Sequence, residues 1–211
     1  QADVVIEAIF ENLEAKRKLF ADIEAIAKPD AVLASNTSSL KLEDIAVGLK
    51  NPARLIGIHF FNPVAKMPLV EVVEGKDSDP EALKKGLAFV RKIDKLALPV
   101  KSAPGFLVNA VLAPYMQEAM RCVDEGIAPE VVDEAALAFG MPLGPIELAD
   151  TVGLDIAVAA GQQLASGITE PPKKLMELVN AGHLGRKTGR GFYTYNQGKP
   201  QKGAIGQVPA G

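Results

Sequence analysis

Several features that would place a protein in a particular class are absent from these 211 residues. With a single cysteine, Cys122, no internal disulfide can form, and a reducing compartment suits the chain. No apolar run approaches the roughly 20 residues that a membrane-spanning helix needs. The net charge of -3 offers no positive surface for nucleic acid. We therefore expect no nucleic-acid partner and no membrane span.

Two glycine motifs are also missing. A dinucleotide-binding fold opens with a G-x-G-x-x-G turn between its first strand and first helix. An α/β-hydrolase carries its serine in G-x-S-x-G. Neither motif occurs in the chain. The first absence leaves a dinucleotide pyrophosphate without a glycine loop to bind. The second counts against a serine hydrolase built on Ser38, His59 and a carboxylate.

What is present in the first half is an alternation of apolar runs and helical patterns. Strands are predicted at 4–9, 31–34, 55–61, 69–73 and 96–100, and helices at 12–27, 42–49 and 80–93. This alternation predicts a largely parallel, doubly wound α/β sheet. Because the chain enters the strand at 4–9 directly, we expect the second half of a Rossmann-like sheet, within a piece of a longer protein.

After Pro104-Gly105 the pattern becomes helical. Helices are predicted at 106–123, 129–139, 145–165 and 171–181. Residues 104–195 are therefore predicted to form an all-helical second domain. Residues 196–211 hold Gly, Pro, Gln and Lys with little to bury, which predicts a flexible linker.

One of the two histidines lies in an informative pattern. His59 occurs in G-I-H-F-F-N-P from residue 57, and Glu71 follows twelve residues later in L-V-E-V-V. An excursion through Pro63 and Pro68 can bring the two predicted strands side by side. A carboxylate beside imidazole fixes its tautomer and stabilises imidazolium, which suits a general base. From spacing alone, a satisfied core histidine beside a strand-edge carboxylate is an equally open interpretation.

Four motifs, in order and spacing, resemble those of the 3-hydroxyacyl-CoA dehydrogenases. They are A-S-N-T-S-S-L from Ala34, G-I-H-F-F-N-P-V from Gly57, M-P-L-V-E-V-V-E-G from Met67 and P-G-F-L-V-N from Pro104. The resemblance spans residues 2 to 196 and is strongest to the dehydrogenase region of multifunctional fatty-acid oxidation enzymes. It implies that residues 1–103 are the C-terminal part of an NAD-binding domain, with the glycine turn before Gln1. It implies that 104–195 are the family's helical C-terminal domain.

The resemblance also assigns site residues. His59 would be the general base that takes the proton of the 3-hydroxyl, with Glu71 as its carboxylate partner. The substrate-binding residues would be Ser38 and Asn109, and the cofactor-binding residues would be Glu11, Lys16, Ser38, Asn62 and Lys187. No metal site is assigned.

From the residues alone, four of these positions keep structural alternatives. Ser38, or the adjacent Ser39, could cap the next helix. Asn109 could be an ordinary residue at a helix start. Glu11 and Lys16 could be an exposed pair on a helix.

The function implied is NAD-dependent oxidation of L-3-hydroxyacyl-CoA to 3-ketoacyl-CoA in fatty-acid β-oxidation. The isolated chain is expected to be inactive for want of the glycine loop. Two alternatives stay open: a stand-alone 3-hydroxybutyryl-CoA dehydrogenase using NAD or NADP, and a non-catalytic helical packing or dimerisation module. The resemblance further implies an acyl-CoA substrate, and a homo-oligomer or packing against further domains. It implies a cytoplasmic bacterial enzyme, or a peroxisomal or mitochondrial one in a eukaryote.

Overall fold

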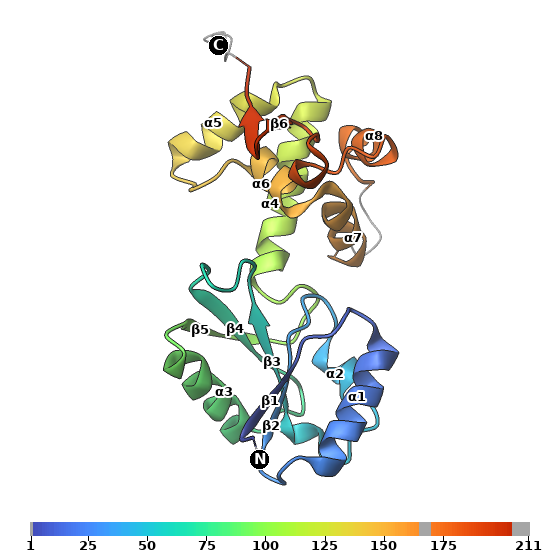
Figure 1. The fold of residues 1–211 in the computed structure, drawn as a ribbon, viewed down its shortest axis with the longest axis vertical. Coiled ribbons are helices and arrows are strands. Elements are labelled where there is room, and N and C mark those ends of the chain that lie inside the picture. The colour runs from blue at the N-terminus through green and yellow to red at the C-terminus, as the bar shows by residue number, and fades with distance from the viewer. Residues whose placement is uncertain (1, 165–169, 204–211) are drawn as a thin grey trace. The chain divides into compact units, whose positions relative to one another are not determined.

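The computed structural model describes residues 2–164 and 170–203, and its chain divides into two compact units, Gln1–Asn109 and Ala110–Gly211 (Figure 1). Strands and helices alternate through the first unit. Their bounds are β1 Val4–Glu7, α1 Leu13–Ile26, β2 Val32–Ser35, α2 Leu42–Ile45, β3 Leu55–Phe60, β4 Leu69–Glu74, α3 Pro80–Lys92 and β5 Leu96–Lys101. The expected strands and helices of this region are all present, and only their ends differ.

The five strands form one sheet in chain order, from β1 to β5. Strands β1, β2 and β3 are parallel, β4 runs antiparallel to β3, and β5 is parallel to β4. The predicted Rossmann-like, largely parallel sheet is therefore confirmed. The reversal between β3 and β4 sets His59 directly opposite Glu71 in the ladder.

Helices cover both faces of the sheet (Figure 1). On one face, Phe20 of α1 and Ile45 of α2 pack with Leu33 and Leu55. On the other, α3 packs against a cluster of Val32, Ala34, Ile56, Ile58, Val70 and Val72. Successive strand residues point to opposite faces, so Glu7, Ser35, His59 and Glu71 lie on the face away from α3.

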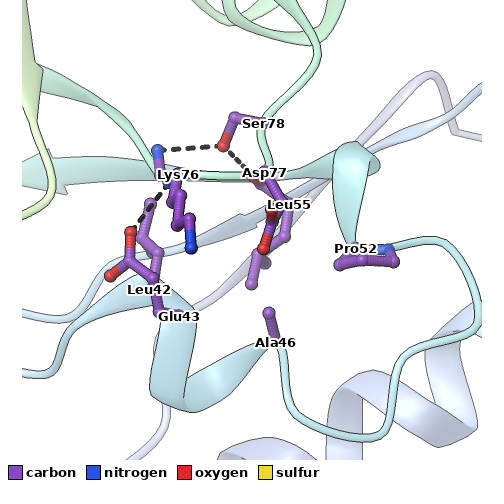
Figure 2. Close-up of a pocket in the computed structure, with 9 residues that line it drawn as sticks. Leu42, Glu43, Ala46, Pro52, Leu55, Lys76, Asp77 and Ser78 are labelled. Carbon is purple, nitrogen blue, oxygen red and sulfur yellow. Dashed lines mark hydrogen bonds between the residues drawn. The ribbon is translucent and has the colours of Figure 1, made fainter.

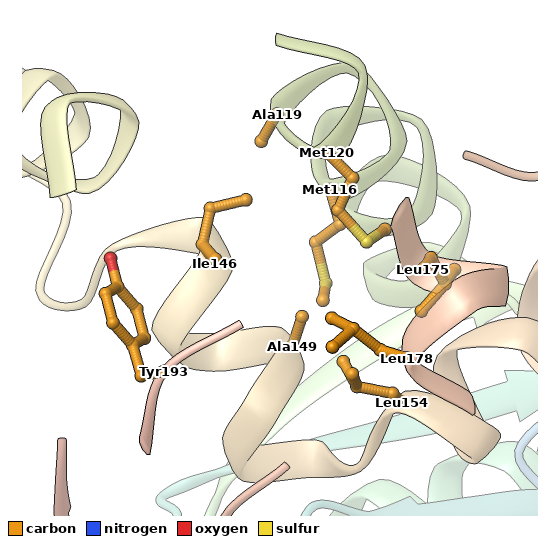
Figure 3. Packing of buried hydrophobic residues seen from close by; sticks show 9 residues of the cluster. All are labelled: Met116, Ala119, Met120, Ile146, Ala149, Leu154, Leu175, Leu178 and Tyr193. Carbon is orange, nitrogen blue, oxygen red and sulfur yellow. The ribbon is translucent and has the colours of Figure 1, made fainter. Parts of the chain in front are cut away.

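The second unit is mainly helical. Its elements are α4 Val108–Asp124, α5 Pro129–Phe139, α6 Pro145–Val152, α7 Leu154–Leu164, α8 Lys173–Asn180, a 3-10 turn at Arg186–Thr188, β6 Thr194–Asn196 and β7 Lys199–Gln201. Helix α4 begins two residues before the unit boundary. Its core gathers Met116, Ala119, Met120, Ile146, Ala149, Leu154, Leu175, Leu178 and Tyr193 (Figure 3). Four helices thus contribute apolar side chains to one cluster.

Two sequence-based expectations are wrong in this unit. The single helix expected at 145–165 is two helices, α6 and α7. Gly153 lies between them with a φ of 110°, whereas an α-helix requires a negative φ at every residue. Residue 165 lies outside the described residues.

The second wrong expectation is the flexible linker from residue 196. Residues Thr194–Asn196 pair with Lys199–Gln201 as a hairpin, which follows the predicted helical region. Gln197 and Gly198 both have positive φ, 48° and 76°, as a tight hairpin turn requires. The N–H of Gly203 also donates to Glu130 at 2.9 Å. Residues 204–211 lie outside the described residues.

Two buried carboxylates hold this region together. Asp133 accepts hydrogen bonds from the N–H of Ile146 and the hydroxyl of Tyr193, both at 2.8 Å. Asp150 accepts from the N–H of Tyr193 at 2.9 Å, and burial raises its pKa. Gly144 lies against Asp133, where a Cβ would come within 2.2 Å of Cγ. Only glycine therefore fits at that position.

Candidate active site

The imidazole of His59 and the carboxylate of Glu71 form a buried pair. Nδ1 of His59 lies 2.8 Å from Oε2 of Glu71, and the two residues are 6 % and 0 % exposed. Because an ionised carboxylate can only accept, Nδ1 carries a proton, and in the neutral ring the lone pair is then on Nε2. The expected juxtaposition is confirmed. Nε2, which forms no hydrogen bond with the described residues, is the nitrogen that can accept a proton.

The second oxygen of Glu71 binds the start of helix α4. Oε1 accepts hydrogen bonds from the N–H groups of Leu107, at 3.0 Å, and Val108, at 2.9 Å. Burial acts to raise the pKa of Glu71. The hydrogen bonds from His59, Val108 and Leu107 outweigh it and hold this pKa below the ordinary 4.5. The carboxylate therefore stays ionised at neutral pH, between the imidazole and the helix.

Two aromatic rings lie against His59. Their centroids are 4.6 Å away for Phe61 and 5.7 Å away for Phe106. Phe106 is buried and has a φ of +53°, in the left-handed region that bulky residues rarely adopt. Such outliers are found most often at functional sites. The rings give the imidazole an apolar surrounding that limits access of water.

A second polar cluster joins Glu11 to the serine loop, residues 37–39. Oε1 of Glu11 accepts from the hydroxyl of Thr37 at 2.5 Å, the N–H of Ser38 at 3.0 Å, and the N–H and hydroxyl of Ser39 at 3.3 and 3.1 Å. Burial would raise the pKa of Glu11, but these donors hold it below its ordinary value. The serines do not cap helix α2, whose N-cap residue is Lys41. They bind Glu11 instead.

Lys16 is fully buried, so the interpretation of an exposed helix pair is wrong. Its Nζ lies 2.6 Å from Oε1 of Glu7, 3.3 Å from the carbonyl oxygen of Ile9 and 3.4 Å from Oε2 of Glu11. Glu7 is buried as well, and its Oε2 accepts from the hydroxyl of Ser35 at 2.7 Å. Lysine is almost never fully buried unless it is paired, as it is here.

These groups gather at one edge of the sheet. Glu11 follows β1, the serine loop follows β2, and His59 and Asn62 lie at the end of β3. Because the three strands are parallel, their carboxyl ends share the edge where ligands of doubly wound sheets bind. Asn62 is exposed there. The structure thus brings together four of the residues that the sequence singled out.

Asn109 and Lys187 belong to other elements. Asn109 is half-buried in the first turn of α4, directly after Val108, whose N–H binds Glu71. Lys187 lies in the second unit, where its Nζ pairs with Asp155 at 2.6 Å. The roles expected for both stay predictions.

Sequence reasoning missed four residues of this edge: Glu7, Ser35, Asn36 and Thr37. The side chain of Asn36 accepts from the N–H of Phe60 at 2.9 Å and so joins the ends of β2 and β3. All four lie where a strand ends. Polar residues at the carboxyl ends of successive parallel strands are a signal that could have identified them.

A small hollow beside α2 is not a ligand site. Leu42, Glu43, Leu55, Lys76 and Ser78 line it, together with four neighbours (Figure 2). Its volume is about 10 Å³, near that of a single water. Its polar groups are already paired: the N–H of Lys76 binds Glu43 and the hydroxyl of Ser78 binds the carbonyl of Leu55.

Within residues 2–164 and 170–203, no group of three or more His, Cys, Asp or Glu side chains could hold a metal ion. Over that same part of the chain, no helix combines the length and the apolar character that crossing a bilayer requires.

Comparison with known proteins matches both halves of the chain to one family. Residues 1–103 match the 3-hydroxyacyl-CoA dehydrogenase NAD binding domain, and residues 105–195 match the C-terminal domain of the same family. The chain is 45% identical over 202 residues to a probable 3-hydroxybutyryl-CoA dehydrogenase of Bacillus subtilis (strain 168), covering 93% of this chain and 70% of that protein.

A fatty acid oxidation complex subunit alpha of Vibrio campbellii is 44% identical; the match covers 94% of this chain but only 29% of the subunit. The crystal structure of 3-hydroxybutyryl-CoA dehydrogenase from Escherichia coli K12 has a TM-score of 0.89 and 38% identity, covering 100% of this chain and 46% of that one. The chain therefore belongs to the 3-hydroxyacyl-CoA dehydrogenase family of NAD-binding oxidoreductases.

Proposed function

We propose that this chain carries the catalytic pair for oxidising L-3-hydroxyacyl-CoA to 3-ketoacyl-CoA with NAD, with His59 as general base and Glu71 as its partner. The observation that carries the proposal is the 2.8 Å contact of Nδ1 with the fully buried Glu71. It leaves the lone pair of Nε2 available to take the proton of the substrate's 3-hydroxyl. The carboxylate stabilises the imidazolium that forms. Fatty-acid β-oxidation is the setting that the Vibrio relative supports.

The groups at the sheet edge suit a nicotinamide dinucleotide. The carboxylate of Glu11, the hydroxyl of Ser38 and the amide of Asn62 are acceptors and donors that match ribose hydroxyls and a carboxamide. Lys16, whose Nζ lies 3.4 Å from Oε2 of Glu11, and Lys187 are the other two cofactor residues that we propose. When bound, NAD supplies the chemistry of hydride acceptance from C3. The protein supplies the base and holds the geometry.

Ser38 and Asn109 are the proposed substrate contacts. Ser38 is exposed, its N–H donates to Glu11 at 3.0 Å, and its hydroxyl makes only a long contact of 3.5 Å with the same oxygen, so a ligand oxygen can compete for that hydroxyl. Asn109 follows the amide that binds Glu71, so its position is tied to the catalytic pair through one peptide unit. An amide side chain there can donate to a substrate carbonyl.

The 211 residues contain no glycine loop, so we expect the chain alone to turn over no substrate. The test therefore uses an extended enzyme: this chain joined at its N-terminus to a strand, a G-x-G-x-x-G turn and a helix. We expect it to oxidise NADH in the presence of acetoacetyl-CoA. His59→Ala should lower kcat by about 10²–10⁴. His183→Ala, the matched control at the only other histidine, should leave kcat unchanged.

Two results would contradict the proposal. One is an extended enzyme that binds NADH yet reduces no 3-ketoacyl-CoA. The other is a His59→Ala variant that keeps the parent rate.

A further inference from the structure

The segment that leads from strand β5 into helix α4, residues 102–108, supplies three groups around the pair of His59 and Glu71. Two of its backbone N–H groups bind Oε1 of Glu71, at 3.0 and 2.9 Å, and the ring of Phe106 lies 5.7 Å from the imidazole between centroids. Gly105 and Phe106 both have positive φ, 70° and 53°, and such a turn directs successive N–H groups toward one anionic oxygen. The position of the carboxylate therefore depends on how residues 102–108 are held.

Ser102 anchors the start of this segment with both its hydroxyl and its backbone. Its Oγ accepts the N–H of Leu42 at 3.1 Å and donates to Oε2 of Glu43 at 2.8 Å. Its own N–H donates to the carbonyl of Glu74 at 2.8 Å. Within the part of the chain that the structure describes, the N-cap residue of α2, Lys41, makes no side-chain cap. The hydroxyl of Ser102 therefore satisfies an N–H that the first turn of this helix leaves free.

Glu43 ties this anchor to a third part of the chain. Its Oε1 accepts the N–H of Lys76, just after β4, at 2.8 Å (Figure 2). Burial acts to raise the pKa of Glu43, but hydrogen bonds from backbone N–H groups and from Ser102 hold this pKa below the ordinary 4.5. The carboxylate is therefore ionised at neutral pH, and an ionised acceptor makes the stronger hydrogen bond to the hydroxyl of Ser102.

Apolar packing extends the anchor to Phe106. Leu42 and Phe106 are 2 % and 4 % exposed and belong to one cluster with Val73. The N–H of Phe106 also donates to the carbonyl of Ala103 at 3.0 Å, which closes the turn between them. The segment is thus held at its start by Ser102 and farther on by Leu42, whose own N–H binds Ser102. Loss of the hydroxyl loosens both attachments.

The anchor lies away from the edge where the ligand groups gather. Strand β5 is parallel to β4, and β4 is antiparallel to β3, so β5 ends at the edge opposite the carboxyl ends of β1, β2 and β3. Ser102 directly follows β5. From there the segment returns along the sheet to Glu71, which pairs with Leu98 in the middle of β5.

We propose that Ser102 and Glu43 are positioning residues of the active site, which hold residues 102–108 in the conformation that binds Glu71. They touch neither substrate nor cofactor and act on His59 through the segment and Glu71. The assignment rests on the proposed function for its catalytic consequence. It gives the paired polar groups beside α2, where the hollow is too small for a ligand, a task in the site.

The variant that tests the proposal is Ser102→Ala, which removes the hydroxyl, and Ser102→Thr is the conservative change that keeps it. The control for lost stability is Leu83→Ala, because Leu83 is a half-buried residue of α3 that packs on the opposite face of the sheet.

The first measurement is amide hydrogen exchange in the 211-residue chain. We expect the amides of Leu107 and Val108 to exchange about tenfold faster in Ser102→Ala, because their local opening no longer has to break the contacts of the hydroxyl. Glu43→Ala should act in the same direction. Both amides should keep the parent rate in Ser102→Thr and in Leu83→Ala. Unchanged exchange in Ser102→Ala, or an equal acceleration in Leu83→Ala, would overturn the proposal.

The second measurement is steady-state kinetics of the extended enzyme. Misplacing Glu71 and His59 should lower kcat by about 10- to 100-fold in Ser102→Ala, with the KM for NAD held within about twofold, and Ser102→Thr should restore kcat. Faster exchange with an unchanged kcat would confine Ser102 to folding and overturn the proposal. A rise of about tenfold or more in the KM for NAD at constant kcat would overturn it as well. The exchange result is independent of turnover, so an extended enzyme without any activity would count against the proposed function alone.

Discussion

Replacing Glu71 by Gln should invert the tautomer of His59. The amide has one oxygen, and three protein groups compete for it: the N–H of Leu107, the N–H of Val108 and Nδ1–H of His59. If the oxygen keeps the two backbone donors, the NH₂ group faces Nδ1. Nδ1 must then accept, and its proton moves to Nε2. If the amide turns round, its NH₂ faces these two part-buried backbone donors, which are left without an acceptor.

The magnitudes decide between these orientations. A fully buried N–H group left unpaired costs about 1–3 kcal/mol, so leaving these two part-buried groups unpaired costs up to about 2–6 kcal/mol. The first orientation avoids that cost, so we expect the inverted tautomer. A proton on Nε2 removes the lone pair that a general base needs. The resulting loss in kcat should be about 10²–10⁴, or about 2.7–5.4 kcal/mol of transition-state stabilisation. Because both backbone hydrogen bonds remain, the free energy of unfolding should fall by only about 1–2 kcal/mol.

Two assays check this prediction. Nitrogen NMR of the 211-residue chain reports which ring nitrogen of His59 carries the proton, whether or not the chain turns over. Steady-state kinetics of the extended enzyme report kcat and KM separately. The control is Glu74→Gln, since Glu74 lies on the same strand but pairs with Lys101 at the surface, where ion pairs contribute about 0–1 kcal/mol. A proton still on Nδ1, or an unchanged kcat with a raised KM for acyl-CoA, would refute the reasoning.

Three further predictions follow from the sequence and the packing. The 211-residue chain should bind NADH weakly and reduce no acetoacetyl-CoA; fluorescence titration and an NADH absorbance assay check this, and measurable turnover would contradict it. The pKa of Glu71 lies below 4.5 in the folded protein, so its contribution to stability is present above that pH and is lost as pH falls through the folded value. Urea unfolding from neutral to acid pH should show this loss in the parent and less of it in Glu71→Gln. Gly144→Ala should lower the free energy of unfolding by about 1–3 kcal/mol, because its Cβ overlaps Asp133. Gly161→Ala, whose Cβ would meet its nearest atom at 3.4 Å, should be neutral or stabilising.

The sheet and the catalytic pair could be predicted because their signals are local or repeated. Short β-branched runs set off by turn residues identify buried strands, and the antiparallel return from β3 to β4 places His59 opposite Glu71. The break at Gly153 was not predictable in this way, since apolar residues stand on both sides of it, Val152 before and Leu154 after. The hairpin at 194–201 has mostly polar strands of three residues each, so its pattern resembles that of a linker.

The buried network at the sheet edge was missed for a different reason. Glu7 ends an apolar run and Lys16 lies in an amphipathic helix, and both positions are ordinary for solvated charges. Both partners of Glu7 are distant in the sequence: Lys16 is 9 residues away and Ser35 is 28 residues away. The parallel pairing of β1 with β2 brings Ser35 to Glu7, and the packing of α1 brings Lys16 to the same carboxylate. A local pattern carries no information about such a tertiary contact.

The contact of Glu71 with Leu107 and Val108 bears on how such a chain can be recombined. The family match for the NAD binding domain ends at residue 103, yet the carboxylate beside His59 is completed by amides four and five residues beyond it. Exchanging domains at residue 103 would pair the base of one protein with the helix start of another. Exchanging them after Asn109 would transfer His59 and Glu71 together with the two backbone N–H groups that bind Glu71. Where natural or engineered chimeras of this family stay active, their crossover points should therefore fall after Asn109 and not at residue 103.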